Sequence, residues 1–158
     1  MADLTLNDLA TLVGLISGTV GAVLGVLNHL RNAYKVIVEL QWDMDATNAA
    51  DLDPNKKWGV IRVSNIGRRP AYVSHVALGL PKGYEDSHLI LMEGLQGQKL
   101  EEGAPPLTYP VDQEGLEKYG RDWRDVRAQV SDATGKVWRS PKKRRESAPS
   151  WAKQDENS

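Results

Sequence analysis

The sequence predicts a mainly β protein in which one N-terminal transmembrane α-helix precedes an antiparallel β-sandwich. Two observations predict this fold class: an uncharged apolar run near the N-terminus, and a change from helical to strand periodicity directly after it. The 158 residues divide accordingly into a helix over residues 1–33, a β-sandwich domain over 34–140 and a disordered basic and polar tail over 141–158.

The apolar run from Leu9 to Leu30 contains no charged residue. As a helix, roughly 22 residues would extend about 33 Å, which matches the hydrocarbon core of a bilayer. Asp8 and Arg31 close the run, and the acidic start differs from a cleavable signal peptide, which begins with positive charge. We therefore expect a single-pass protein of the cell membrane. The alternative is a buried helix of a soluble fold.

Four glycines of this run follow one another at intervals of four, three and four residues, and they are Gly14, Gly18, Gly21 and Gly25. At about 100° per residue they share one face of the helix. Small residues allow close backbone approach between membrane helices, so this stripe predicts a homo-oligomer formed through the helix. The alternative explanation is that glycine is simply common in membrane helices.

The charges that flank the run predict its orientation. Asp3 and Asp8 precede it, whereas Arg31 and Lys35 follow it. Because positively charged flanks stay on the cytoplasmic side, we expect the β domain to face the cytoplasm.

After the helix, Val36, Val38, Leu40 and Trp42 alternate with more polar residues, which predicts a first strand with these four side chains on one face. An acidic loop is expected over 43–55 and a second strand over 56–65. A turn is expected over 66–70, where Gly67 is available for a positive φ. A third strand over 71–80 should place on one face Tyr72, Ser74, Val76, Leu78 and Leu80.

The second half predicts a short strand over 88–92 and an edge segment near Tyr109, because proline interrupts it. Two helical turns are expected over 112–119, with Asp112 as the cap, and a hairpin over 125–140. About seven short strands at such turn-rich spacing are typical of an immunoglobulin-like sandwich.

The stretches VIRVSNIGRRPAYVSHVALGL and VRAQVSDATGKVWRS resemble a loose group of small, mostly uncharacterised bacterial proteins. In that group one N-terminal membrane helix precedes a β-sandwich. The resemblance covers about a third of the domain and rests on turns and core strands. It implies the architecture and brings no activity with it.

Composition and motifs argue against several chemistries. With 20 basic and 21 acidic residues the formal net charge is −1, so nucleic acid is not an expected partner, and the absence of cysteine excludes disulfides and thiolate metal sites. The acidic loop lacks the glycine and glutamate of a calcium loop, since Asn48 and Pro54 stand in those places. His29, His75 and His88 lack metal-ligand spacing. We expect no cofactor, no metal and no enzymatic activity.

Two groups of basic residues could bind anions. Arg68 and Arg69 lie in an expected turn, where keeping a hairpin soluble is their commoner role. The tail carries a run that could contact anionic lipid or simply be solvated, formed by Lys142, Lys143, Arg144 and Arg145. Trp138 and Trp151 flank this run.

Together these features predict a membrane-anchored, non-enzymatic binding or assembly module. The lipid bilayer and an unknown protein would be its partners. The alternative is a small membrane-active effector or pore former whose helix oligomerises under control of the β domain. A third hypothesis is a soluble sandwich that uses the first helix to cover its own core.

Overall fold

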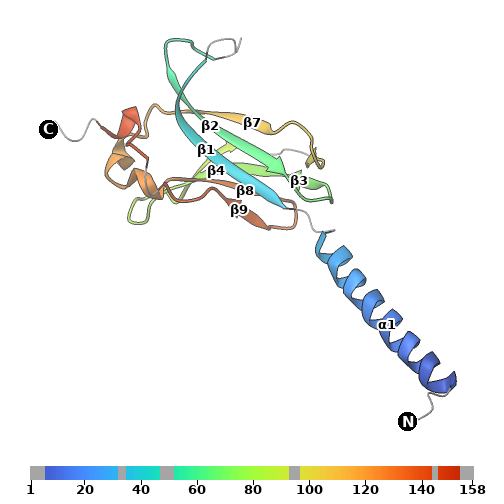
Figure 1. The fold of residues 1–158 in the computed structure, drawn as a ribbon. Helices are drawn as coiled ribbons and strands as arrows, with labels where there is room; N and C mark the ends of the chain where they lie inside the picture. Colours follow the sequence, from blue (N-terminus) through green and yellow to red (C-terminus); the bar gives the residue numbers. More distant parts are fainter. Residues whose placement is uncertain (1–5, 32–34, 47–51, 93–96, 144–145, 154–158) are drawn as a thin grey trace. The chain divides into compact units, whose positions relative to one another are not determined.

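The chain consists of two compact units, Met1–Ala33 and Tyr34–Ser158 (Figure 1). The structure is a computed structural model, and it describes residues 6–31, 35–46, 52–92, 97–143 and 146–153. Its described elements are antiparallel strands, one long N-terminal helix and two 3-10 helices, which confirms the predicted fold class of a mainly β protein with an N-terminal helix.

The first unit contains helix α1, Leu6–Arg31. Between Asn7 and His29 it is long and apolar enough to cross a membrane, a property that some core helices of soluble proteins and some signal sequences share. Its hydroxyl groups are satisfied within the helix. Ser17 and Thr19 donate hydrogen bonds of 2.7 and 2.8 Å to the carbonyl oxygens four residues earlier. Such bonding lets polar side chains lie in apolar surroundings without an orphaned donor.

One sheet of the second unit has the strand order β1-β2-β7. Its strands are β1 (Val36–Asp45), β2 (Lys57–Asn65) and β7 (Leu107–Asp112). The predicted alternation of β1 is confirmed, because Val36, Val38 and Leu40 are buried. As predicted from Pro110, β7 lies at the edge of this sheet.

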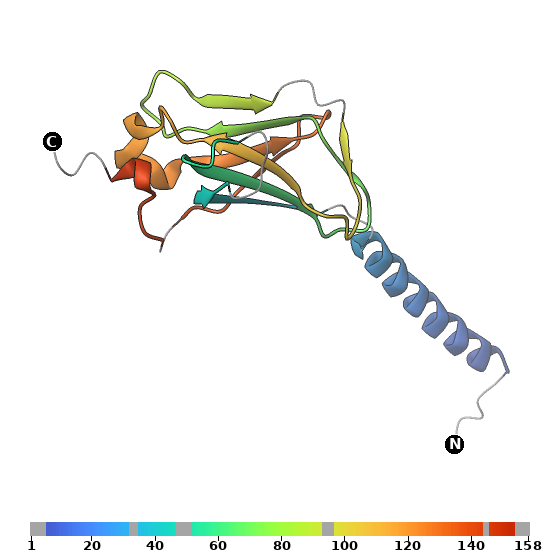
Figure 2. The ribbon, with the colours of Figure 1, turned by 90° about the horizontal axis from the view of Figure 1, so that it is seen from above.

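A four-stranded sheet has the order β5-β4-β8-β9. Its strands are β4 (His75–Gly79), β5 (His88–Met92), β8 (Arg127–Ser131) and β9 (Val137–Arg139). A further antiparallel pair joins β3 (Ala71–Val73) to β6 (Gln98–Leu100), a strand that the sequence had not indicated. The two larger sheets form opposite layers, with β1 on one side of the unit and β5 on the other (Figure 2). Between them lies one hydrophobic core.

The third strand is not continuous, contrary to the prediction for residues 71–80. It divides at Ser74 into β3 and β4, which belong to different sheets, and the Ser74 N–H donates a 2.8 Å hydrogen bond to the Ser131 carbonyl. The alternation therefore shifts by one residue at the break. Ala71 and Val73 are buried, whereas Tyr72, predicted on the same face as Val76, is exposed.

The turn after β2 does not use a positive φ at Gly67, which corrects the expectation for this glycine. Asn65 holds the turn with its own side chain. Its Oδ1 accepts a 3.0 Å hydrogen bond from the Gly67 N–H, and its Nδ2 donates at 2.7 Å to the Arg69 carbonyl. The side chain of the buried Asn65 thus stabilises the turn, a role that the sequence had indicated for Gly67.

The helix expected over 112–119 is also displaced. Asp112 ends β7, Gly115 has φ 84°, and the 3-10 helix η1 covers Glu117–Asp125. The core explains the later start, because Tyr119 and Trp123 face inward at helical spacing.

The tail expected to be disordered from residue 141 is structured where the structure describes it. The 3-10 helix η2, Ser150–Ala152, packs beside η1 and buries Trp151. Sequence periodicity did not indicate that Trp151 is buried, because it lies in a polar segment with no periodic apolar pattern. Residues 144–145 and 154–158 of the predicted tail lie outside the described residues.

The predicted acidic loop begins later than residue 43, because β1 continues to Asp45. A register shift lies between Gln41 and Met44, and Asp43 has φ 59°. This irregularity turns the Asp43 carboxylate toward η2, where it accepts hydrogen bonds from the Ser150 N–H at 2.9 Å and the Ser150 hydroxyl at 2.5 Å.

Candidate functional site

The candidate functional site lies on the outer face of the four-stranded sheet of the β unit. Its inward-facing residues, such as Val76 and Val130, belong to the core, so the alternate residues of the same strands point outward. Gln129 on β8 is central to this face. It pairs with Ala77 on β4 and with Arg139 on β9. Two hollows meet at Gln129, one cationic and one apolar.

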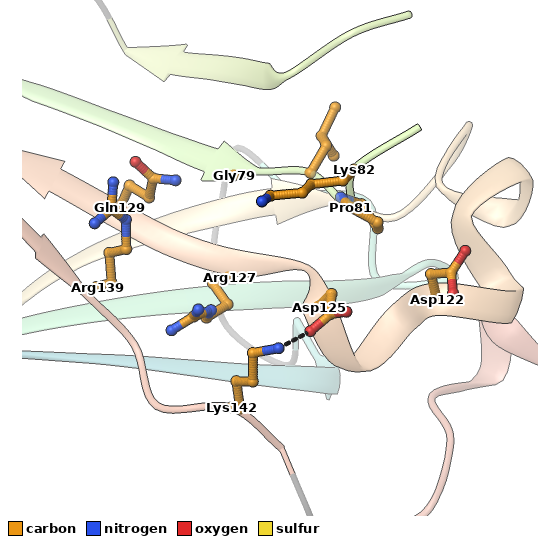
Figure 3. A pocket seen from close by; sticks show the side chains of 10 residues that line it. Gly79, Pro81, Lys82, Asp122, Asp125, Arg127, Gln129, Arg139 and Lys142 are labelled. Carbon is orange, nitrogen blue, oxygen red and sulfur yellow. Dashed lines mark hydrogen bonds and ion pairs between the residues drawn. The ribbon is translucent and has the colours of Figure 1, made fainter. Parts of the chain in front are cut away.

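The first hollow, termed the cationic pocket, has a volume of about 420 Å³. It lies where the sheet meets the loop after β4 and the end of η1 (Figure 3). Its charged lining consists of Lys82, Asp122, Asp125, Arg127, Arg139 and Lys142. Four cations and two carboxylates leave a formal charge of +2.

The two carboxylates of the cationic pocket are already engaged. Asp125 forms an ion pair with Lys142, and Asp122 accepts a 3.2 Å hydrogen bond from the Tyr84 hydroxyl. Among the ion pairs of the described residues, none involves Lys82, Arg127 or Arg139. The uncompensated positive charge therefore resides on these three side chains.

Gly79 shapes the floor of this pocket. A Cβ atom at this position would lie 2.0 Å from Nε2 of Gln129 and 3.0 Å from its Cδ. Glycine therefore lets the Gln129 amide lie across β4, close to Lys82 and Arg139 in the view of Figure 3. The result is a neutral hydrogen-bonding group among the cations.

The second hollow, termed the apolar hollow, has a volume of about 280 Å³. Ile90 on β5 and Val137 on β9 line it, with exposed fractions of 59% and 41%. His75 and His88 also line it, although they are far apart in sequence. The antiparallel pairing of β4 with β5 brings these histidines to one surface, and His88 Nδ1 lies 3.0 Å from the Ser87 hydroxyl.

The described residues contain no group of three or more histidine, aspartate or glutamate side chains that could hold a metal. In the acidic segment, each described carboxylate has another role. Asp43 binds Ser150, Asp45 pairs with Lys57 at 2.5 Å, and Asp53 accepts a 2.9 Å bond from the Asn55 N–H. Asn48 and Asp51 lie outside the described residues.

The basic run of the tail is only partly placed. Lys142 lines the cationic pocket, whereas Lys143 donates hydrogen bonds of 2.8 and 2.6 Å to the Glu146 carboxylate. Arg144 and Arg145 lie outside the described residues. Both described lysines of the run therefore have a carboxylate partner.

The glycine stripe lies on α1 as the sequence indicated. A Cβ atom at any of its four positions, Gly14, Gly18, Gly21 or Gly25, would meet nothing within 4 Å. Its role in self-association stays a prediction.

No protein-family model and no curated protein matches this chain. The apolar N-terminal helix and the antiparallel sheets agree with the resemblance at the level of architecture.

Proposed function

We propose that the chain is a membrane-anchored, non-enzymatic binding module. In this proposal α1 crosses the bilayer once, and the β unit binds an anionic partner on the outer face of its four-stranded sheet. The observation that carries the proposal is the cationic pocket, with its formal charge of +2 and three cations outside any ion pair among the described residues.

The surface of α1 supports the anchoring role. Leu15 and Leu24 have exposed fractions of 69% and 60%, and at about 100° per residue they point to opposite sides of the helix. A surface helix of a soluble protein has one apolar stripe, whereas a helix that is apolar all round suits a membrane. Among the residues that the structure describes, all buried hydrophobic side chains lie between Val36 and Trp151, so the β unit closes its own core. This closure disfavours the soluble-sandwich hypothesis.

Membrane fractionation with an alkaline carbonate wash tests the anchor. We expect the full chain to stay in the pellet. Protease should reach the β unit only after spheroplasts are opened, because Arg31 and Lys35 favour a cytoplasmic β unit. Release of the chain by carbonate would rule out the membrane anchor. Cleavage of the β unit in intact spheroplasts would show that it lies outside the cytoplasm.

The binding face is tested by salt elution of the full chain from a phosphocellulose column. We expect Arg127→Gln/Arg139→Gln to elute at lower salt than the wild type, because the pocket loses two of its cations. The matched control is Arg68→Gln/Arg69→Gln, which makes the same change in net charge at an exposed turn. Equal shifts of the two variants would show that retention depends on net charge and not on the pocket.

The alternative proposal is a membrane-active effector or pore former. The open space beside all four glycines of α1 favours helix assembly, which this function requires. The two proposals differ on expression. A pore former should depolarise cells, and Gly18→Leu should relieve the effect, whereas an anchored binding module should leave the membrane potential unchanged.

We also propose that the β unit is an immunoglobulin-like sandwich related to the small bacterial proteins that its sequence resembles. The two facing antiparallel sheets and the preceding apolar helix support this kinship.

A further inference from the structure

We propose that the cationic pocket binds the phosphate group of a phosphate monoester. The inference deepens the proposed function and rests on it, because it assigns a ligand chemistry to the same binding face. Its elements are the guanidinium groups of Arg127 and Arg139, the ammonium group of Lys82 and the amide of Gln129.

The strand register places the two arginines within reach of one ligand. Arg139 on β9 is opposite Gln129 on β8, and Arg127 precedes Gln129 by two residues on the same face. Diagonal neighbours of this kind in antiparallel strands lie about 7–8 Å apart, a separation that two long side chains span easily. In Figure 3, Lys82 and Arg127 both extend toward the side of the pocket where Gln129 and Arg139 lie.

Charge and donor geometry favour phosphate over carboxylate. A phosphate monoester carries a charge of about −1.5 to −2 at pH 7 and offers three strong acceptor oxygens. The formal pocket charge of +2 matches that dianion. Guanidinium groups bind phosphate through two parallel hydrogen bonds, which a lysine cannot do. A single carboxylate, with one charge and two oxygens, would leave part of the donor set without a partner.

The apolar hollow indicates what the ester carries. Gln129 lines both hollows, so a ligand held by its phosphate at Arg139 can continue over Ala77 toward Ile90 and Val137. Apolar surface beside an anion site suits an ester whose organic part is aromatic or aliphatic. The ligand class is therefore a phosphate monoester with an apolar body, either a soluble molecule or a lipid with a monoester headgroup.

Calorimetric titration of the full chain in phosphatidylcholine nanodiscs tests this assignment, with phenyl phosphate as the probe. Phenyl sulfate has a similar shape but a single charge. We expect phenyl phosphate to bind at least about tenfold more tightly than phenyl sulfate, because its second negative charge strengthens the charge-assisted hydrogen bonds with the pocket cations. The affinity for phenyl phosphate should fall between pH 7.5 and 5, because the ester takes up a proton near pH 6. Equal affinity for the two probes, or no binding of phenyl phosphate, would overturn the proposal.

Variants of the pocket residues test whether phenyl phosphate binds in the cationic pocket. Arg127→Gln/Arg139→Gln should weaken phenyl phosphate binding at least about tenfold, while Arg68→Gln/Arg69→Gln should leave it within about twofold. Lys82→Gln, in a loop outside the sheet, provides a second pocket variant should the double variant fail to fold. Undiminished affinity in a folded pocket variant would overturn the proposal.

Doping the nanodiscs with phosphatidic acid, a lipid monoester, separates the two sources of ligand. Competition with phenyl phosphate would identify a lipid headgroup, and unchanged phenyl phosphate affinity would identify a soluble ester; both support the pocket chemistry. The phosphocellulose experiment distinguishes failure of the monoester assignment from failure of the proposed anionic binding face. Pocket-dependent retention on phosphocellulose without phenyl phosphate binding would overturn the monoester alone and leave the anionic binding face in place.

Discussion

The indole rings of Trp42 and Trp151 meet edge to face, with centroids 5.4 Å apart and an interplanar angle of 76°. This contact joins the first strand of the β unit to its last described helix, η2. Because Trp151 is only 4% exposed, the segment after residue 146 is part of the fold and not an appendage.

Replacing Trp151 by alanine should lower the free energy of unfolding by about 3–5 kcal/mol, which is typical for the loss of a large buried aromatic side chain. Urea denaturation followed by circular dichroism measures the change. Ile90→Ala provides the control, because Ile90 is 59% exposed and its loss should matter little. A Trp151→Ala midpoint equal to the wild type would show that η2 does not stabilise the fold.

Asp43 combines a backbone strain with a capping role. At φ 59° it accepts hydrogen bonds from the N–H and the hydroxyl of Ser150, so Asp43→Ala should lose those bonds and also place alanine in the left-handed region. Asp43→Gly loses the same bonds without that strain. We expect alanine to be less stable than glycine by about 1 kcal/mol, as judged by urea midpoints. Equal midpoints would mean that the backbone relaxes at this position.

The turn between β8 and β9 should make stability depend on acid. Partial burial acts to raise the pKa of Asp132, but it is outweighed by hydrogen bonds from the Thr134 hydroxyl and from the N–H groups of Thr134 and Lys136, which lower the pKa below its ordinary 3.8. A lowered folded-state pKa gives stability that is present above the unfolded pKa and is lost as the pH falls through the folded pKa.

Asp132→Asn is the corresponding variant, since it keeps an oxygen acceptor and removes the charge. We expect it to be less stable than the wild type at pH 7. The difference should shrink once the pH falls below 3.8. Thermal unfolding at pH 7, 4 and 2.5 measures it, and a difference that is independent of pH would contradict the lowered pKa.

Sequence periodicity predicted which side chains of a single strand are buried, but it did not predict which strands pair with one another. Val36, Val38 and Leu40 were placed correctly, because alternation alone determines which face of a strand is apolar. The break at Ser74 was missed, because a continuous run of strand-forming residues does not reveal that the chain changes sheets.

The cationic pocket was missed for a related reason. Adjacent arginines such as Arg68 and Arg69 attract notice in a sequence. By contrast, Lys82 and Arg127 are brought together only by the pairing of β4 with β8. The usable signal was the hairpin over 125–140, which was predicted and which places Arg127 and Arg139 on neighbouring strands. Counting outward-facing residues on both strands would have shown that they share a face.

The glycine stripe of α1 gives a prediction about assembly in the membrane. Gly18→Leu/Gly21→Leu should shift the chain toward the monomer, because bulky side chains prevent close backbone approach between helices. Crosslinking in membranes measures the change, and the control is Leu12→Ala/Val23→Ala, which changes the opposite face of the helix and leaves the stripe intact. An unchanged oligomeric state in the leucine variant would show that the stripe is not an interface.

Gly79 provides a test of pocket geometry that leaves every pocket charge in place. In Gly79→Ala the new Cβ would lie 2.0 Å from Nε2 of Gln129, so the flexible amide must move away from β4. We expect phenyl phosphate binding to weaken by about tenfold, which corresponds to roughly one hydrogen bond.

The double variant Gly79→Ala/Gln129→Ala separates displacement from obstruction. If the moved Gln129 side chain obstructs the pocket, removing it should restore part of the affinity. If the amide instead contributes a hydrogen bond from its original position, the double variant should bind as weakly as Gln129→Ala alone. Wild-type affinity in both Gly79→Ala and Gln129→Ala would exclude the amide from recognition and leave the ligand to the three cations, because neither its position nor its presence would then matter.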